Sequence, residues 1–232
     1  MNIFYQPLIP QGVLHLDEDE SRHCVKVLRK KKGDMLRLTD GAGSFYDAVI
    51  TAENPKACMF EITAQTPQAR RSYTIHVAIS PTKNADRIEW FTEKTVELGI
   101  DAITLMECEN TERTHSKTER LTKVAISAMK QSVKATLPRI EGLTAFKDVV
   151  ARSSARGRYI AFVDNSNPLH LLKAARGNED YLVLIGPEGD FSRGELALAM
   201  EMKFEKVSLG PNRLRTETAG LAACHILNLI NT

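Results

Sequence analysis

The 232-residue chain has no apolar run that approaches the roughly 20 residues needed for a membrane-spanning helix. Its first residues, MNIFYQPLIPQG, lack a cationic segment followed by a long apolar one, so no secretory signal is predicted. Four cysteines are scattered without a C-x-x-C pair, and six histidines show no ligand spacing. These absences favour a cytoplasmic protein with reduced, mostly buried thiols and no metal.

The sequence also has little net charge, only +2 at pH 7, which gives no sign of a general attraction to nucleic acid. Hydrophobic residues at 43% and charged residues at 26% are ordinary for a globular protein and argue against disorder or a fibrous repeat. Charge is instead concentrated locally, because DEDE at residues 17–20 precedes RHCVKVLRKKK at 22–32. That basic run is either a solvated face or a docking surface for RNA phosphates.

The sequence divides into two regions with different patterns of predicted secondary structure. Residues 1–70 are rich in strand candidates (MLRL, SFYDAVIT and KACMFEIT), with DGAG at 40–43 as a hairpin turn, so a small barrel or sandwich is predicted. Apolar residues become sparse at 66–72, which indicates a linker. From residue 73 to residue 232, strands and helices alternate, which predicts an α/β domain with a parallel sheet.

The α/β region shows several start and stop signals. A helix over DRIEWFTEKTVEL ends at Gly99, between the strands YTIHVAIS and AITLMEC. Ser116 and Glu119 form a capping box that opens a helix through LTKVAISAMKQSVKA, ended by Pro138. RYIAFVD, YLVLI and KVSL are expected to continue the series of strands, each followed by a helix.

The first of two unusual loops lies in LIGPEGDFSRGE, residues 184–195. YLVLI at 181–185 is typical of a strand buried on both faces, and Ser192 with Glu195 makes a capping box just after it. GPEGDF is therefore the whole connection. Its two glycines permit close backbone approach or positive φ, and its proline fixes one φ. The loop is predicted to be shaped for a ligand, although a simple tight turn is the alternative.

The second loop, GPNRLR, follows KVSL at residues 206–209. Thr216 is expected to cap the next helix, whose apolar stripe comprises Ala219, Ala222, Ala223, Ile226, Leu227 and Ile230. Both loops are predicted to follow neighbouring strands and to form one pocket at the carboxyl edge of the sheet. Neither matches G-x-x-x-x-G-K-[ST] or G-x-G-x-x-G, so a small organic cofactor is favoured over a nucleoside triphosphate or dinucleotide.

LIGPEGDFSRGE and LGPNRLRTETAG, together with HCVKVLRKKKGD, KNADRIEWFTEKTVELGI and ENTERT, resemble a known family. This family is that of the bacterial 16S ribosomal RNA uridine N3-methyltransferases, which are S-adenosylmethionine-dependent enzymes of the SPOUT superfamily. The resemblance implies a PUA-like RNA-binding β-barrel at 1–70, and a SPOUT α/β domain with a deep trefoil knot at 73–232. It also implies a homodimer that methylates one uridine in the decoding region of the small ribosomal subunit.

The resemblance further implies a cofactor pocket made by the knot loops. Its residues here would be Leu184, Ile185, Gly186, Pro187, Glu188, Gly189, Leu209, Gly210, Pro211, Leu214, Thr218 and Ala219. The sequence departs from the family pattern at Asp190, where a glycine is usual, and at Lys130 and Lys134, where an acid and an arginine are common. Asp tolerates left-handed backbone geometry better than most residues, so the turn at Asp190 is expected to survive.

Methylation at N3 requires loss of a proton that uridine mostly retains at neutral pH. A fixed guanidinium would stabilise the negative charge on the uracil oxygens, and Arg215 is the first candidate, with Arg113 second. Glu217 would orient an arginine or accept the proton; alternatively, Arg215 and Glu217 form only a helix-end ion pair. RNA docking is assigned to Arg22, Lys26, Arg29, Lys30, Lys31 and Lys32, joined by Lys83 and Arg87.

Two other functions remain open at this point. The first is a SPOUT RNA methyltransferase that modifies a ribose hydroxyl or another base, because the cofactor loops say little about the acceptor atom. The second is a non-catalytic RNA-binding assembly factor that keeps the fold.

Overall fold

The computed structural model describes residues 2–112, 118–162 and 169–232. The chain forms two compact units, one of Met1–Arg70 with Ile126–Leu137, and one of Arg71–Ala125 with Pro138–Thr232. None of the helices in the described part of the chain is long and apolar enough to cross a membrane. All four cysteines are free and buried, as the sequence predicts.

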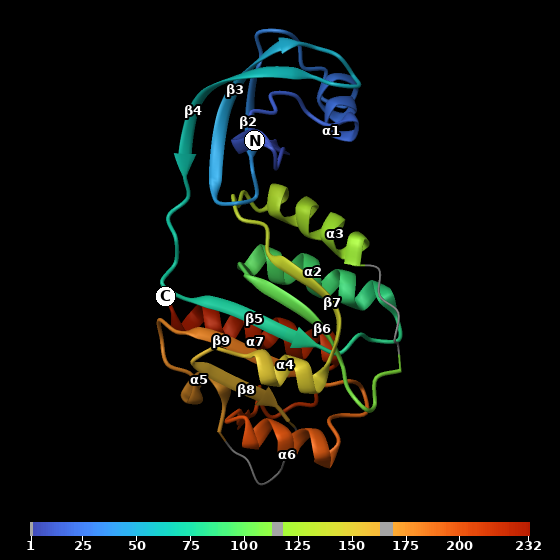
Figure 1. Cartoon of the computed structure of the whole chain (residues 1–232), viewed down its shortest axis with the longest axis vertical. Helices are drawn as coiled ribbons and strands as arrows, with labels where there is room; N and C mark the ends of the chain where they lie inside the picture. The colour runs from blue at the N-terminus through green and yellow to red at the C-terminus, as the bar shows by residue number, and fades with distance from the viewer. Residues whose placement is uncertain (1, 113–117, 163–168) are drawn as a thin grey trace. The chain divides into compact units, whose positions relative to one another are not determined.

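The first unit is built on a sheet with the strand order β1-β2-β3-β4 (Figure 1). Its strands are β1 (Ile3–Tyr5), β2 (Met35–Thr39), β3 (Ser44–Ala52) and β4 (Met59–Pro67). The last three are antiparallel and confirm the predicted strands, whereas β1, which pairs in parallel with β2, was not predicted. Gly41 and Gly43, with φ of 74° and 115°, make the turn between β2 and β3 possible.

Three short helical segments lie between β1 and β2. They are the 3₁₀ helix η1 (Ile9–Gln11), α1 (Glu18–Arg22) and the π-helix η2 (His23–Val27). The acidic run at 17–20 forms the start of α1, where the Asp17 side chain accepts a hydrogen bond from the Glu20 amide at 2.8 Å. Leu16, Leu38 and Ile50 are fully buried in the core between these segments and the sheet.

The first unit also contains the end of helix α3 (Thr118–Gln131) and the residues after it. The Ala135 carbonyl accepts hydrogen bonds from the Gly43 amide at 2.9 Å and the Thr39 hydroxyl at 3.1 Å. The prediction that this helix continues to Pro138 is wrong, because Val133 has a φ of 56° and the helix has already ended. The predicted capping serine, Ser116, lies outside the described residues.

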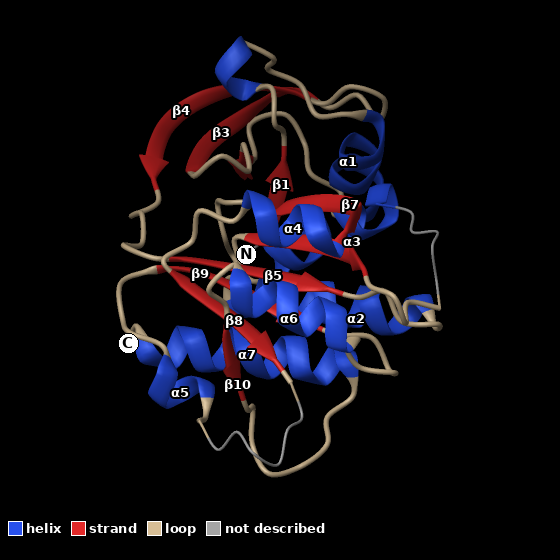
Figure 2. Cartoon of the chain, turned by 60° about the horizontal axis from the view of Figure 1, so that its bottom comes forward, coloured by secondary structure: helices blue, strands red, loops and turns tan. Residues whose placement is uncertain are grey.

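The second unit is an α/β layer structure around a parallel sheet with the order β10-β8-β9-β5-β6-β7. Its strands are β5 (Thr74–Ile79), β6 (Ala102–Glu107), β7 (Arg139–Ala145), β8 (Gly157–Ala161), β9 (Asp180–Ile185) and β10 (Glu205–Val207). The sequence predicted all of them except β7. Because β8 separates β9 from β10, the expectation that the two loops follow neighbouring strands is wrong. Figure 2 shows β8, β9 and β10 running alongside one another.

Helices cover both faces of this sheet. They are α2 (Ala85–Leu98), α4 (Phe146–Arg152), α5 (Leu171–Ala174), α6 (Arg193–Glu201) and α7 (Thr216–Ile230). Helix α7 packs against β5 and β9 on one face of the sheet, beside α2 and α5. Helices α4 and α6 pack against each other on the opposite face. Figure 1 shows α4 in front of the sheet and α7 behind it. The predicted C′ residue of α2 is confirmed, since Gly99 is left-handed with φ of 93°.

Helix α7 differs in detail from its prediction. Its N-cap is Arg215, which makes no capping hydrogen bond, and Thr216 is already the first helical residue. The predicted stripe is only partly buried, and the fully buried face includes Gly220, Ala223, Cys224 and Leu227. A Cβ on Gly220 would lie 2.6 Å from the Phe91 ring, so a glycine is what lets α7 approach α2 this closely.

Candidate functional site

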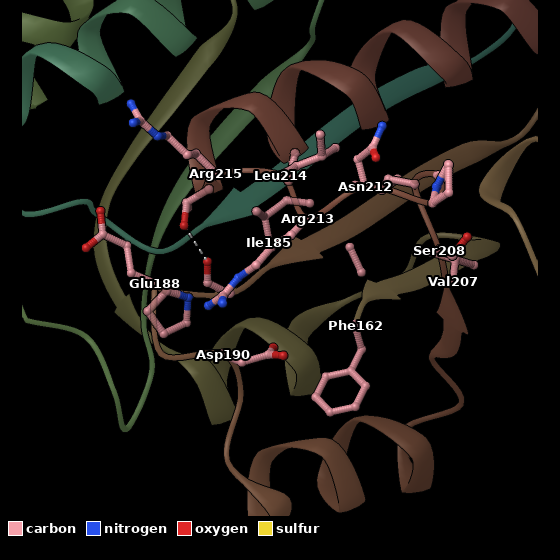
Figure 3. Close-up of a pocket in the computed structure, with 18 of the residues that line it drawn as sticks. Phe162, Ile185, Glu188, Asp190, Val207, Ser208, Asn212, Arg213, Leu214 and Arg215 are labelled. Atoms are coloured by element: carbon pink, nitrogen blue, oxygen red, sulfur yellow. Dashed lines mark hydrogen bonds between the residues drawn. The ribbon is translucent and has the colours of Figure 1, made fainter. Parts of the chain in front are cut away.

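The carboxyl ends of β8, β9 and β10 enclose a cavity of about 910 Å³ (Figure 3). Strand β9 and its loop contribute residues 185–188 and Asp190; β10 and its loop contribute residues 207–216. The floor between them is formed by Ala161 and Phe162 at the end of β8, and Arg87, His170 and Ala219 complete the wall. The two glycine-proline loops therefore meet around one cavity, although β8 lies between their strands.

The loop after β9 is held in place by close backbone packing. A Cβ on Gly186 would lie 3.0 Å from the Phe191 ring, and one on Gly189 would lie 3.3 Å from Asn110. The Asn110 amide nitrogen donates to the carbonyls of Gly189 at 3.3 Å and Asp190 at 3.0 Å. The capping box of Ser192 and Glu195 is confirmed and fixes the start of α6. This loop has little freedom of its own.

Asp190 occupies the position where the resemblance expects glycine. Its φ is 63°, so the left-handed turn is kept, and its carboxylate accepts a hydrogen bond from the Phe191 amide at 2.8 Å. Burial raises the pKa of this carboxyl, while the Phe191 amide and the charge of Arg213 act in the opposite direction. In Figure 3 Asp190 and Phe162 face the cavity from the side opposite Leu214.

The two loops are joined by one hydrogen bond. The Thr216 hydroxyl donates to the Gly186 carbonyl at 3.1 Å, and both residues are buried (Figure 3, dashed line). The loop after β10 turns at Gly210, whose φ of 132° strongly favours a glycine. Thr216 thus links the start of α7 to the end of β9.

Arg87 on α2, a predicted RNA-docking residue, lies at this site. Its Nη1 lies 2.8 Å from Oε1 of Glu188, and its Nε lies 3.8 Å from Oε1 of Glu217. The Glu217 side chain is only 9% exposed, and a buried charge needs a partner. Arg87, which comes from another helix, balances the charge of Glu217. Arg87 connects the first loop to helix α7.

A second cavity of about 600 Å³ adjoins the first and shares Arg87, Arg213, Leu214 and Arg215 with it. Its other lining residues are Asp86, Trp90, Glu217 and Thr218. Arg215 is exposed, and in Figure 3 its guanidinium points away from the cofactor-sized cavity. Within the described ranges no acidic side chain pairs with Arg215, and Glu217 pairs with Arg87, so the alternative Arg215–Glu217 ion pair is not formed.

Most of the predicted cofactor residues line the larger cavity. The exceptions are Leu184, which is buried inside β9, Gly189, which contacts Asn110, and Thr218, which lines the second cavity. Arg215 and Glu217 both line the second cavity, whereas Arg113 lies outside the described residues. Phe162, Ser208 and Asn212 also line the first cavity and were not predicted, and Arg213 of the second loop lines it without having been assigned to the cofactor. Phe162 could have been predicted, because it lies near the end of the predicted strand RYIAFVD and the carboxyl ends of such strands border the ligand site.

The other predicted RNA-docking residues are divided between the units. Arg22 pairs with Glu18 at 2.7 Å on α1, and the Lys30 ammonium donates to the Met35 carbonyl at 3.0 Å. Lys26, Arg29, Lys31 and Lys32 are exposed in the same segment of the first unit. In the second unit, Lys83 lies 3.4 Å from Glu112. The basic segment of the first unit is thus mostly exposed, which fits either a solvated face or a docking surface.

A parallel sheet whose strand-end loops enclose a cofactor-sized cavity, joined to a small N-terminal β-sheet unit, defines a two-unit α/β protein of the cofactor-binding class. Residues 69–228 match the RNA methyltransferase domain family, and residues 16–63 match the RNA methyltransferase PUA domain. The chain belongs to this RNA methyltransferase family. The expected α/β fold with a parallel sheet and a PUA-like N-terminal domain is confirmed, while the knot and the homodimer stay predictions.

Similar proteins span nearly the whole chain. Ribosomal RNA small subunit methyltransferase E of Rickettsia conorii is 30% identical, over 97% of this chain and 93% of the relative. The crystal structure of a "probable rRNA-methyltransferase" from Porphyromonas gingivalis is 43% identical with a TM-score of 0.94, covering 100% and 98%. Ribosomal RNA small subunit methyltransferase E of Neisseria gonorrhoeae, bound to S-adenosyl methionine, is 26% identical with a TM-score of 0.83, covering 100% and 98%.

Proposed function

We propose that this protein transfers a methyl group from S-adenosylmethionine to N3 of a uridine in the decoding region of 16S ribosomal RNA. The observation that carries the proposal is the pair of adjoining cavities, which share Arg87, Leu214 and Arg215. One cavity suits a methyl donor, and the other is open to an acceptor. The small-subunit methyltransferases named above support the RNA substrate. The acceptor atom is supported by the resemblance of the whole chain, and not of the loops alone, to the uridine N3-methyltransferases.

The residues of the larger cavity fit S-adenosylmethionine. Its volume of about 910 Å³ lies in the range of roughly 300–1,000 Å³ typical of cofactor sites. Phe162, Ile185 and Leu214 offer apolar surface for an adenine ring, and the open space at Gly210 permits close backbone approach. The half-buried carboxylate of Asp190 favours a cationic group nearby. When bound, the cofactor supplies an electrophilic methyl group, so the protein needs to position the acceptor and manage its proton.

Arg215 and Glu217 are the residues assigned to act on the acceptor uridine. As the proton leaves N3 of uridine, negative charge spreads to the two uracil carbonyl oxygens. The guanidinium of Arg215, which pairs with no acidic side chain among the described residues, can stabilise it. Glu217 is held by Arg87, lines the second cavity and is assigned as the carboxylate that takes that proton. The N3 lone pair would form the new bond to the methyl carbon as the carbon–sulfur bond of the sulfonium breaks, with S-adenosylhomocysteine as the leaving group. Arg113 keeps its assignment as the second candidate cation.

The PUA-like first unit would bring the protein to RNA. Its segment 22–32 presents exposed lysine and arginine side chains, whose charges suit phosphate groups. Neutralising phosphates releases condensed counterions, so binding through this segment should weaken steeply as salt is added.

Two measurements test the proposal. Calorimetry should show binding of S-adenosylmethionine to the isolated protein; no binding would favour a non-catalytic assembly factor. Incubation with labelled cofactor and small subunits from a strain lacking the corresponding enzyme should place one methyl group on N3 of a decoding-region uridine. That product blocks base pairing and stops reverse transcription, whereas a ribose methyl leaves the pairing edge free and would contradict the N3 assignment.

A further inference from the structure

The second cavity carries an aromatic side chain that no step of the proposed reaction uses. Trp90 lies on helix α2, one turn after Arg87, and lines this cavity. Its side chain is 41% exposed, although the neighbouring Phe91 is fully buried against α7. A partly exposed indole at a cavity wall can serve as a platform on which a flat ring stacks.

Glu217 provides a second, independent sign of a ligand in the same cavity. Its side chain is more than nine-tenths buried, and its Oε1 is paired with Arg87. Its other oxygen, Oε2, is buried without a hydrogen-bond donor among the described residues. A buried carboxylate oxygen without a donor is costly. Because Glu217 lines this cavity, the oxygen indicates that a donor binds there.

The charge of the remaining wall suits RNA. Arg213 and Arg215 line the cavity from the loop after β10, and Arg215 has no acidic partner in the part of the chain that the structure describes. A nucleotide presents a flat apolar ring, an edge with N–H donors and carbonyl acceptors, and an anionic phosphate. The indole, the unused carboxylate oxygen and the free guanidinium each match one of these parts.

We propose that the second cavity receives the target base of the RNA, with Trp90 as its stacking platform and Glu217 as the residue that selects uracil. The proposal rests on the proposed function and names the part of the site that recognises the substrate. At N3 uracil carries a hydrogen, which a carboxylate oxygen accepts. Cytosine has only a lone pair at N3, which a carboxylate repels. Glu217 would therefore distinguish the two pyrimidines before any methyl transfer.

The sequence contains a single tryptophan, so tryptophan emission, excited selectively over that of the tyrosines, reports on Trp90 alone. The experiment is a titration of the full-length protein, saturated with S-adenosylhomocysteine, with pentauridylate and separately with pentacytidylate at low salt. Stacking should quench the tryptophan emission with pentauridylate, and pentacytidylate should bind roughly tenfold more weakly or worse. In Glu217→Gln, whose side chain both donates and accepts, the two oligonucleotides should bind within about twofold of each other.

Kinetics on small ribosomal subunits give the complementary readout. Trp90→Ala should raise KM for the subunit roughly 5- to 150-fold, the range expected for the loss of one base–aromatic stack. Trp90→Phe should recover most of this loss. Met200→Ala, which truncates a similarly exposed side chain on α6 away from both cavities, is the matched control and should leave KM unchanged.

The outcomes separate this proposal from the proposed function. If S-adenosylmethionine does not bind the wild-type protein, the proposed function fails. If it binds normally, but pentauridylate leaves the fluorescence unchanged and Trp90→Ala leaves KM unchanged, the base does not lie on Trp90. Equal affinity of the wild-type protein for both oligonucleotides overturns the role of Glu217. A change of oligomeric state in Trp90→Ala, without a change in KM, would identify Trp90 as a contact between copies of the chain instead.

Discussion

The single hydrogen bond between the two loops gives the sharpest test of the cofactor cavity. Replacing Thr216 with valine keeps the shape of the side chain and removes the hydroxyl that donates to the Gly186 carbonyl at 3.1 Å. Because Gly186 is buried, its carbonyl is then left with one partner fewer. Such a loss costs about 1–3 kcal/mol, which corresponds to roughly 5- to 150-fold in an equilibrium constant.

If the cofactor binds between these loops, part of that cost should appear in its affinity. We expect the Kd for S-adenosylmethionine to rise about tenfold in Thr216→Val, measured by calorimetry, with a fall in Tm of only about 2–4 °C for a chain of this size. Thr92→Val is the matched control, since Thr92 is a buried threonine whose hydroxyl bonds to the Ile88 carbonyl of its own helix. A Kd that stays within twofold of wild type in Thr216→Val would refute the joint role of the loops.

Three further predictions concern catalysis, RNA binding and stability. Arg215→Ala should lower kcat by about 10²- to 10³-fold and leave the Kd for S-adenosylmethionine within about twofold; equal losses in both would end its catalytic assignment. Neutralising the three lysines at residues 30–32 should flatten the salt dependence of binding to ribosomal RNA, and an unchanged slope would make that run a solvated face. Burial lowers the pKa of His76 to about 4 from 6.5, so the unfolded chain binds the extra proton first, and stability should fall as pH drops from 6.5 towards 4. Unfolding free energies across that window should lose about 3 kcal/mol in the wild type but not in His76→Phe, and equal losses in both would contradict this origin.

Local signals in the sequence predicted a large share of the fold. The Gly99 C-cap and the capping box of Ser192 and Glu195 depend on neighbours within four residues, so they are readable from the chain itself. The strands β5, β6 and β9 are buried on both faces and appear as continuous apolar runs. The two glycine-proline loops could be recognised for the same reason.

The errors arise where distant segments meet. The order β10-β8-β9 places β8 between the two loops, and no local pattern encodes that order. Arg87 is 101 residues from Glu188 in the chain, so its place at the site depends on how α2 packs against α7. Thr216 has the residue type of a helix cap, yet its hydroxyl donates to a carbonyl 30 residues earlier. β1 is three residues long and pairs with a strand far along the chain, which leaves little periodicity to detect.

The claim on which the other conclusions depend is that a methyl donor binds where the loops after β9 and β10 face each other. A crystal of this protein grown with S-adenosylmethionine tests it most directly. We predict ligand density in the cavity between Ile185 and Leu214, with the sulfonium methyl directed towards the cavity that contains Trp90. Density bound elsewhere on the protein, or a cavity that stays vacant at saturating ligand, would contradict the account.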